Sequence, residues 1–307
     1  MLGLGKIRQA WRRLAWTLIY YGPKRDITLE TANGLLTFSS RDWMIGKILY
    51  LQRSYEMKEI DAAIKLLREE GYLTDGAVST VLDVGANIGM ICIALVRSGH
   101  FQKALAFEPA PGSHRLLVKN VGQNNLASRI TCFPFALSSR RSEVELELSP
   151  DNSGDHRIRH TKNAGAFREE LRPTLRVEAR TLDSLFAENR ELDPQEVSLV
   201  WLDIQGHEGC FLEGAREFLA RGTPIVTELW PYALARSGSE PSRVQALLSE
   251  FYTHFYLLTA NAAEKRPIST MGEVFQAFAG PREMCQVILV RDRSKTADDK
   301  KAFLNQA

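Results

Sequence analysis

Two apolar segments joined by a glycine-bearing turn constrain the fold of this chain of 307 residues more than any other feature. The first segment, 80–85, runs into the turn D-V-G-A-N-I-G at 83–89, and the second segment, 103–108, ends in a glutamate. A helical pattern separates them. A strand, a glycine turn, a helix and a second strand that ends in a carboxylate form the nucleotide-binding half of a doubly wound α/β sheet. The pattern therefore predicts an α/β protein.

The residues of the turn indicate which adenosine cofactor fits it. Dinucleotides need G-x-G-x-x-G, so that bare backbone can approach a pyrophosphate, but Asn87 occupies the place of the middle glycine. Asp83 makes the turn acidic, and Gly85 and Gly89 allow close approach of the backbone. Such a turn suits the zwitterionic methionine end and the sulfonium of S-adenosylmethionine, and Glu108 would accept hydrogen bonds from its ribose. We therefore expect this cofactor, with its adenine near Phe135 and Ala136 at the end of the third strand.

Five further segments complete the predicted sheet. Helical patterns lie between the first five strands and around the sixth. Together these segments predict a seven-stranded, mostly parallel, Rossmann-like sheet of the class I methyltransferase type. In this type of sheet the last strand inserts antiparallel. An insertion at about 143–181 contains paired strand patterns around a polar loop. The loop is either a lid over a substrate or a solvated connection. The five segments are 129–135, 198–204, 223–229, 252–258 and 284–291.

The N-terminal segment has an unusual charge. Its first 25 residues hold six basic residues and no acid, and Leu4, Ile7, Trp11, Leu14 and Leu18 recur at spacings of three and four. This pattern predicts an amphipathic helix that is too short and too charged to span a bilayer. We expect its apolar face to pack on the domain or on a second subunit, as in a homodimer. The alternative is peripheral contact of residues 1–22 with an anionic membrane.

The segments before and after the predicted sheet define the expected domain organisation. Residues 27–39 alternate as a hairpin, and helical patterns follow at 43–73. We therefore expect an N-terminal helical and hairpin extension at 1–78, the cofactor-binding domain at 79–292 and a flexible tail at 293–307.

Composition excludes some partners. The net charge is +2, from 39 basic and 37 acidic residues, which does not favour a nucleic acid or another polyanion. The four cysteines are scattered without a C-x-x-C pair, which indicates reduced thiols and a cytoplasmic protein.

Polar side chains follow the fourth and fifth strands, at the edge where ligands bind in an open α/β sheet. Asp203, or Asp203 orienting His207, is the candidate base that takes a proton from an acceptor hydroxyl. A less favoured alternative has Asp203 and Glu228 hold Mg²⁺, which would lower the pKa of that hydroxyl. The further candidates for contact with the substrate are Gln205, Glu208 and Trp230.

Four segments together resemble the FkbM family of S-adenosylmethionine-dependent methyltransferases. They are D-V-G-A-N-I-G at 83–89, A-F-E-P at 106–109, T-L-D-S-L at 181–185 and W-L-D-I-Q-G-H-E-G at 201–209. The resemblance extends from about Ile27 to Val290, and Tyr55-Glu56 matches a Y-E pair typical of the family.

The resemblance implies O-methylation of a hydroxyl on a small molecule or glycan, and it adds Glu56 and Asp203 to the cofactor-binding residues. Many members have glutamate where this chain has Gln205, so a role that needs negative charge there is not carried over. N-methylation with the same cofactor, or a catalytically silent cofactor-binding scaffold, remain alternatives.

Overall fold

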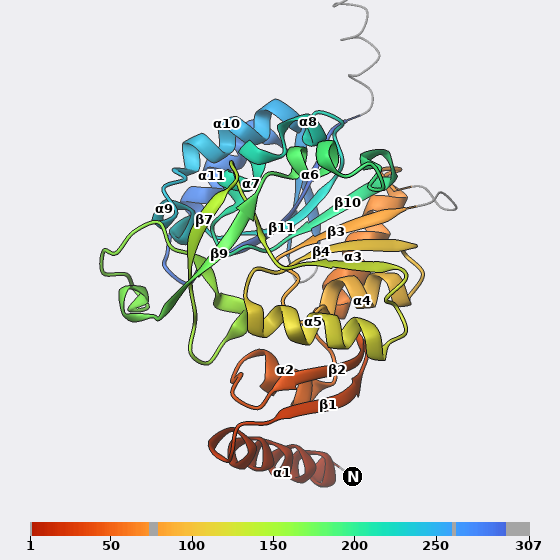
Figure 1. Ribbon diagram of the computed structural model, residues 1–307, viewed down its shortest axis with the longest axis vertical. Coiled ribbons are helices and arrows are strands. Elements are labelled where there is room, and N and C mark those ends of the chain that lie inside the picture. The colour runs from red at the N-terminus through yellow and green to blue at the C-terminus, as the bar shows by residue number, and fades with distance from the viewer. Residues whose placement is uncertain (1, 74–78, 260–261, 293–307) are drawn as a thin grey trace, which may run out of the picture.

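An eight-stranded sheet organises the protein. The computed structural model describes residues 2–73, 79–259 and 262–292, and the predicted tail at 293–307 lies outside them. The strand order is β13-β12-β14-β11-β10-β3-β4-β5, and helices cover both faces (Figure 1). The strands are β3 (Thr80–Val84), β4 (Lys103–Phe107), β5 (Ile130–Phe133), β10 (Val197–Leu202), β11 (Ile225–Leu229), β12 (His254–Leu258), β13 (Ala263–Pro267) and β14 (Cys285–Val290).

The pairing of these strands confirms the predicted fold class. β11, β10, β3, β4 and β5 are parallel neighbours, and β14 lies antiparallel between β11 and β12. All seven predicted strands are present. β13 is an additional edge strand, which sequence reasoning missed because its residues are polar and mostly exposed.

Strand side chains alternate between two cores. Val81 belongs to the core under one layer of helices, and its neighbour Leu82 belongs to the core under the other. The first layer contains α3 (Met57–Glu69), α4 (Met90–Arg97) and α5 (Pro111–Gln123). The helices whose side chains join the second core are α6 (Leu182–Glu188), α7 (Glu208–Gly214), α8 (Arg216–Leu219), α9 (Pro231–Arg236), α10 (Pro241–Phe251) and α11 (Met271–Ala277).

The N-terminal extension is bound to the sheet domain. Its hairpin, β1 (Asp26–Thr31) and β2 (Gly34–Ser39), lies against α5, where the backbone N–H of Thr37 donates to Asn120 Oδ1 at 2.7 Å. Helix α2 (Ile45–Gln52) lies beside the hairpin, and helix α1 (Leu2–Tyr21) lies beyond it at one end of the molecule (Figure 1). Trp16 and Leu36 share a hydrophobic core with the first layer.

Helix α1 does not pack on the domain through the face expected from the sequence. Trp11, Leu14 and Leu18 are exposed, whereas Trp16 is completely buried and contacts the Phe38 ring. The side that packs carries Trp16, Ile19 and Tyr20, and the spacing of three and four residues selected the other side. None of the described helices is long and apolar enough to cross a membrane.

The insertion folds into a second, four-stranded sheet of order β6-β9-β7-β8. The predicted pairing appears as the antiparallel strands β7 (Ser142–Glu147) and β9 (Thr174–Arg180), with β6 (Ala136–Leu137) and β8 (Arg157–Ile158) beside them. Buried ion pairs hold the connecting loop, among them Arg157 with Glu169 at 3.2 Å. The two flanks of the loop are therefore folded onto the protein, whereas most residues of 161–168 are exposed.

Candidate active site

The turn after β3 approaches the end of β10 closely. Gly85 has φ +90°, and a Cβ at this position would lie 1.8 Å from the carbonyl oxygen of Asp203. The backbone N–H of Asp203 in turn donates to the carbonyl of Val84 at 2.9 Å. A glycine is required at position 85 because the two strand ends touch.

Two buried carboxylates hold the turn. Glu108 accepts hydrogen bonds from the backbone N–H groups of Asn87 at 2.9 Å and Ala110 at 2.7 Å. Asp83 accepts one from Cys92 N–H at 3.0 Å. Burial raises the pKa of Glu108 to about 7 and that of Asp83 to about 6, because an ionised carboxylate loses its hydration there.

One cavity, called here the first cavity, brings together most of the residues predicted to bind the cofactor. Gly89 is outside its described lining. A Cβ on Gly89 would meet the side chains of Leu117 and Ile93, so this glycine allows close packing at the start of α4. The predicted residues that line the first cavity are Glu56, Asp83, Gly85, Asn87, Glu108, Phe135, Ala136 and Asp203.

A second cavity adjoins the first at the carboxyl ends of β10 and β11. The residues that line both cavities are Ile45, Tyr55, Glu56, Gly154, Asp203 and Gln205. Further side chains that line only the second cavity are Met44, Ile48, Asp155, Arg157, Phe167, Glu228, Trp230, Arg282 and Met284.

Three carboxylates face this junction from different elements. Asp203 follows β10, Glu228 lies in β11 and Glu56 precedes α3. Burial raises the pKa of all three carboxylates. The negative charge of Asp203 raises the pKa of the other two further, and the pKa of Glu56 reaches about 7. Gln205 donates its side-chain N–H to Asp203 Oδ1 at 2.5 Å, which favours the ionised form of Asp203.

His207 is not oriented by Asp203, contrary to the pairing considered from the sequence. Its Nδ1 is hydrogen-bonded to His160 Nε2 at 2.9 Å and its Nε2 to Ser138 Oγ at 3.0 Å. Burial, and then the neighbouring imidazole of His160, lower the pKa of His207 to about 3. A group that is this weakly basic is a poor acceptor for the proton of an alcohol.

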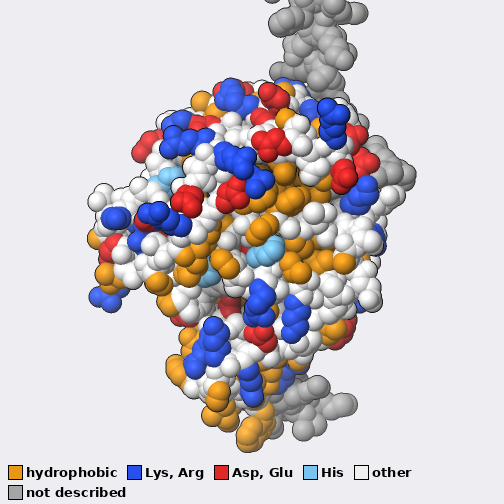
Figure 2. Space-filling view, viewed as in Figure 1, with side chains coloured by type: hydrophobic (Ala, Val, Ile, Leu, Met, Phe, Trp, Pro, Cys, Tyr) orange, Lys and Arg blue, Asp and Glu red, His pale blue; other side chains and the backbone are white. Residues whose placement is uncertain are grey.

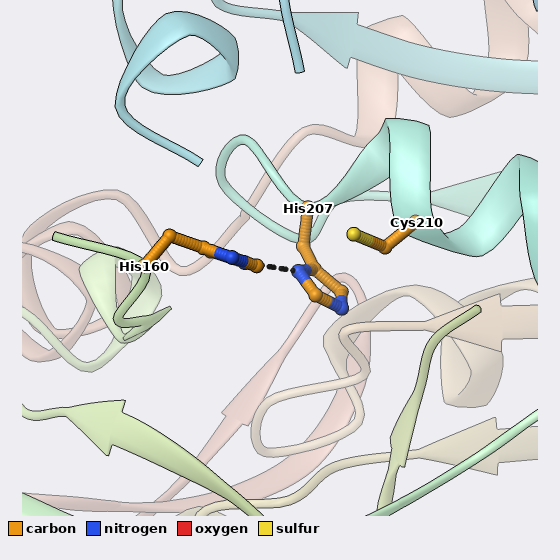
Figure 3. A group of neighbouring side chains, drawn as sticks. All are labelled: His160, His207 and Cys210. Atoms are coloured by element: carbon orange, nitrogen blue, oxygen red, sulfur yellow. Dashed lines mark hydrogen bonds between the residues drawn. The ribbon is translucent and has the colours of Figure 1, made fainter. Parts of the chain in front are cut away.

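A cluster of possible metal ligands lies beside this histidine. Figure 3 shows His207 between His160 and Cys210, and one donor atom of each lies within 4.8 Å of the others. The histidines are already hydrogen-bonded to each other, and burial raises the pKa of the Cys210 thiol. Mg²⁺ prefers oxygen ligands, so this cluster of two imidazoles and a thiol does not suit it. Asp203 and Glu228 lie close enough for the charge of Asp203 to raise the pKa of Glu228, and the magnesium alternative at this pair stays a prediction.

The three candidate substrate residues lie in different surroundings. Gln205 lines both cavities, and Trp230 lines the second, where the guanidinium of Arg157 lies 4.2 Å from its ring centroid. Glu208 is buried and accepts a hydrogen bond from the backbone N–H of Gly206. It is not among the described residues that line the two cavities. Glu208 therefore stabilises the turn that precedes α7 and does not face either cavity.

Sequence reasoning missed the residues that the insertion brings to the site. Ser153 lines the first cavity and its hydroxyl bonds Asn87 Oδ1 at 3.3 Å and Asp42 Oδ2 at 2.5 Å. His156 lines it as well. Neither stands in a motif, and the distance in sequence to the turn hides the contact.

The protein matches a known family. A profile of the methyltransferase FkbM domain matches residues 83–254, which is more than half of the chain. The chain belongs to the FkbM methyltransferase family. This confirms the resemblance seen in the sequence, and the protein is a methyltransferase.

This FkbM family methyltransferase is similar to two curated methyltransferases at low identity. It is similar to the 2-O-methyltransferase NoeI of Sinorhizobium fredii, 26% identical over 176 residues, which cover 54% of this chain and 70% of that protein. It is also similar to the methyltransferase sdnD of Sordaria araneosa, 26% identical over 192 residues, covering 55% and 71%. A solved structure of TYW2 from M. jannaschii in complex with AdoMet has a TM-score of 0.41 at 13% identity, covering 89% of each chain.

Proposed function

We propose that this FkbM family enzyme transfers a methyl group from S-adenosylmethionine to a hydroxyl of a small molecule or glycan. The observation that carries the proposal is the position of Asp203, which lines both cavities where they join. A cofactor in the first cavity and an acceptor in the second would meet beside this carboxylate.

The residues of the first cavity fit this cofactor. Four carboxylates line it, those of Glu56, Asp83, Glu108 and Asp203, and among the described residues no Lys or Arg does. This charge suits a ligand with an ammonium and a sulfonium, and it does not suit one with a pyrophosphate. Each Glu108 oxygen keeps a second lone pair for a ribose hydroxyl.

The second cavity supplies the groups that an alcohol acceptor needs. When bound, S-adenosylmethionine offers a methyl group on a positively charged sulfur. An alcohol is a weak nucleophile at neutral pH. Asp203 can take its proton, because burial brings the pKa of this carboxylate closer to neutral pH than that of an exposed aspartate. Glu228 and Asp203 cannot both ionise easily, so Glu228 holds a proton while Asp203 accepts one.

The acceptor class rests on the walls of the second cavity and on one relative. Trp230 and Phe167 present aromatic rings, with centroids 5.7 Å apart, beside Arg157 and Arg282. Such walls suit a hydroxylated ring that carries polar groups. The name of NoeI as a 2-O-methyltransferase is in keeping with this class.

Transfer of labelled methyl groups tests the proposal. The protein is incubated with methyl-labelled S-adenosylmethionine and a panel of saccharides, polyhydroxylated natural products and matched amines, beside Asp203→Asn and the exposed control Glu264→Gln. We expect label in an ether on a hydroxyl acceptor with the wild type and with the control, but not with Asp203→Asn. Label found only in amines, or no transfer to any acceptor despite cofactor binding, would contradict O-methylation.

A further inference from the structure

Helix α1 presents an apolar stripe to solvent. Trp11, Leu14, Leu18 and Tyr21 are 66%, 50%, 68% and 73% exposed. Their spacing of three, four and three residues places them on one side of the helix. Large apolar side chains gathered in this way mark an interaction surface.

The stripe plays no part in holding α1 to the domain. The opposite side does so, through the buried Trp16, whose ring lies 5.4 Å from that of Tyr50, and through Arg12, which donates to the carbonyl of Tyr50 at 2.7 Å. Trp16 and Leu18 are about 200° apart around the helix axis. Packing on the domain therefore does not account for the stripe.

The charge around the stripe indicates what it contacts. The segment 1–25 contains six basic residues and no acid, and Lys6, Arg13, Lys24 and Arg25 are exposed. Figure 2 shows hydrophobic side chains at the end of the molecule where Figure 1 places α1, with Lys and Arg side chains above them.

We propose that the stripe of α1 docks on an anionic membrane surface. An apolar face with Trp and Tyr and with flanking basic residues is the pattern of a helix that lies in the headgroup region. A second copy of the chain fits less well, because two copies joined through this stripe would bring two basic segments together without an acid between them. Anionic lipids complement the charge of the segment.

A series of ring contacts joins the stripe to the segment that precedes α2. The ring of Tyr21 contacts Tyr20, with centroids 5.1 Å apart, and Tyr20 contacts Trp43 at 4.8 Å. The next residue, Met44, is 48% exposed and lines the second cavity. The stripe and the second cavity are thus connected through neighbouring residues of the N-terminal extension.

Binding to vesicles tests the proposal with the full chain and needs no acceptor. The protein is sedimented with vesicles of phosphatidylcholine alone or of phosphatidylcholine with phosphatidylglycerol. We expect binding to the anionic vesicles that weakens with salt. The triple variant W11Q/L14Q/L18Q should bind about tenfold more weakly or worse, and K6E/R13E should also lose affinity. The matched control V118Q/L171Q changes exposed apolar residues elsewhere and should bind like the wild type.

Melting temperatures of all variants show whether each remains folded. The proposal is overturned if the wild type ignores anionic vesicles, or if the triple variant binds them as well as the wild type does. It is also overturned if ultracentrifugation shows a dimer that only the triple variant dissociates, because the stripe would then be a contact between two copies.

Discussion

The carbonyl oxygen of Asp203 lies 1.8 Å from the point that a Cβ on Gly85 would occupy. We predict that Gly85→Ala lowers the free energy of unfolding by roughly 3 kcal/mol or more, because it adds a backbone clash to the strain of φ +90°. Urea unfolding measures the loss, and calorimetry should show that S-adenosylmethionine binding is lost with it.

Gly99→Ala is the matched control for this substitution. Gly99 has φ +76°, but a Cβ there would meet no heavy atom within 4 Å. Gly99→Ala should lower the free energy of unfolding only by the backbone strain of a positive φ, about 1 to 2 kcal/mol. Equal losses for the two variants would show that the contact with Asp203 does not restrict position 85.

Cofactor binding should depend on pH through Glu108. Burial raises the pKa of Glu108 to about 7, and only the ionised carboxylate accepts hydrogen bonds through both oxygens. The affinity for S-adenosylmethionine should therefore fall about tenfold from pH 8 to pH 6. The free energy of unfolding of the cofactor-free protein should change with pH in the opposite direction. Between the pKa of Glu108 in the unfolded chain and its higher pKa in the folded protein, the folded protein holds the extra proton. Its stability therefore rises as the pH falls through this range. Calorimetry at several pH values checks the first trend, which should be shallower in Glu108→Gln.

The two tryptophans of α1 should differ in their effect on stability. Trp16 is completely buried and Trp11 is 66% exposed. Trp16→Ala should cost about 3 kcal/mol, since it leaves a cavity beside Phe38 and Tyr50, whereas Trp11→Ala should stay within about 0.5 kcal/mol. Comparable losses in urea unfolding would mean that the exposed stripe packs on the protein after all.

Gln205 should set the pH at which methyl transfer begins. Its amide donates to Asp203 at 2.5 Å. A second carboxylate there would repel the first, so Gln205→Glu should raise the pKa of Asp203 and move the acid limb of the rate profile upward by about one pH unit. The exposed Gln102→Glu serves as the control and should leave the profile in place. An unchanged profile in both variants would separate Asp203 from the proton transfer.

The sequence allowed the central sheet to be predicted because its strands are buried and apolar. Local signals of this kind do not exist for β13, whose residues are mostly exposed at the edge of the sheet. They mislead at α1, where the face with the regular apolar spacing points to solvent, whereas Trp16, Ile19 and Tyr20 pack on the hydrophobic core.

The clustering of the candidate site residues could be predicted where position on a strand was enough. Asp83, Glu108 and Asp203 lie at or near strand ends, and the sheet brings them to one cavity. The partners of His207 could not be predicted, because His160 and Ser138 come from distant parts of the chain. The contribution of Ser153 likewise depends on how the insertion folds back.

Replacement of Asp203 tests whether this carboxylate takes the proton of the acceptor hydroxyl. Asp203→Asn is nearly isosteric, and we predict S-adenosylmethionine affinity within a few-fold of the wild type by calorimetry. Turnover on the hydroxyl acceptor identified by methyl labelling should fall by about 10² to 10⁴, because the base that takes the proton is gone, while Glu264→Gln keeps full activity. Near-native turnover of Asp203→Asn would contradict the account, since the carboxylate at the junction of the two cavities would then have no part in the transfer.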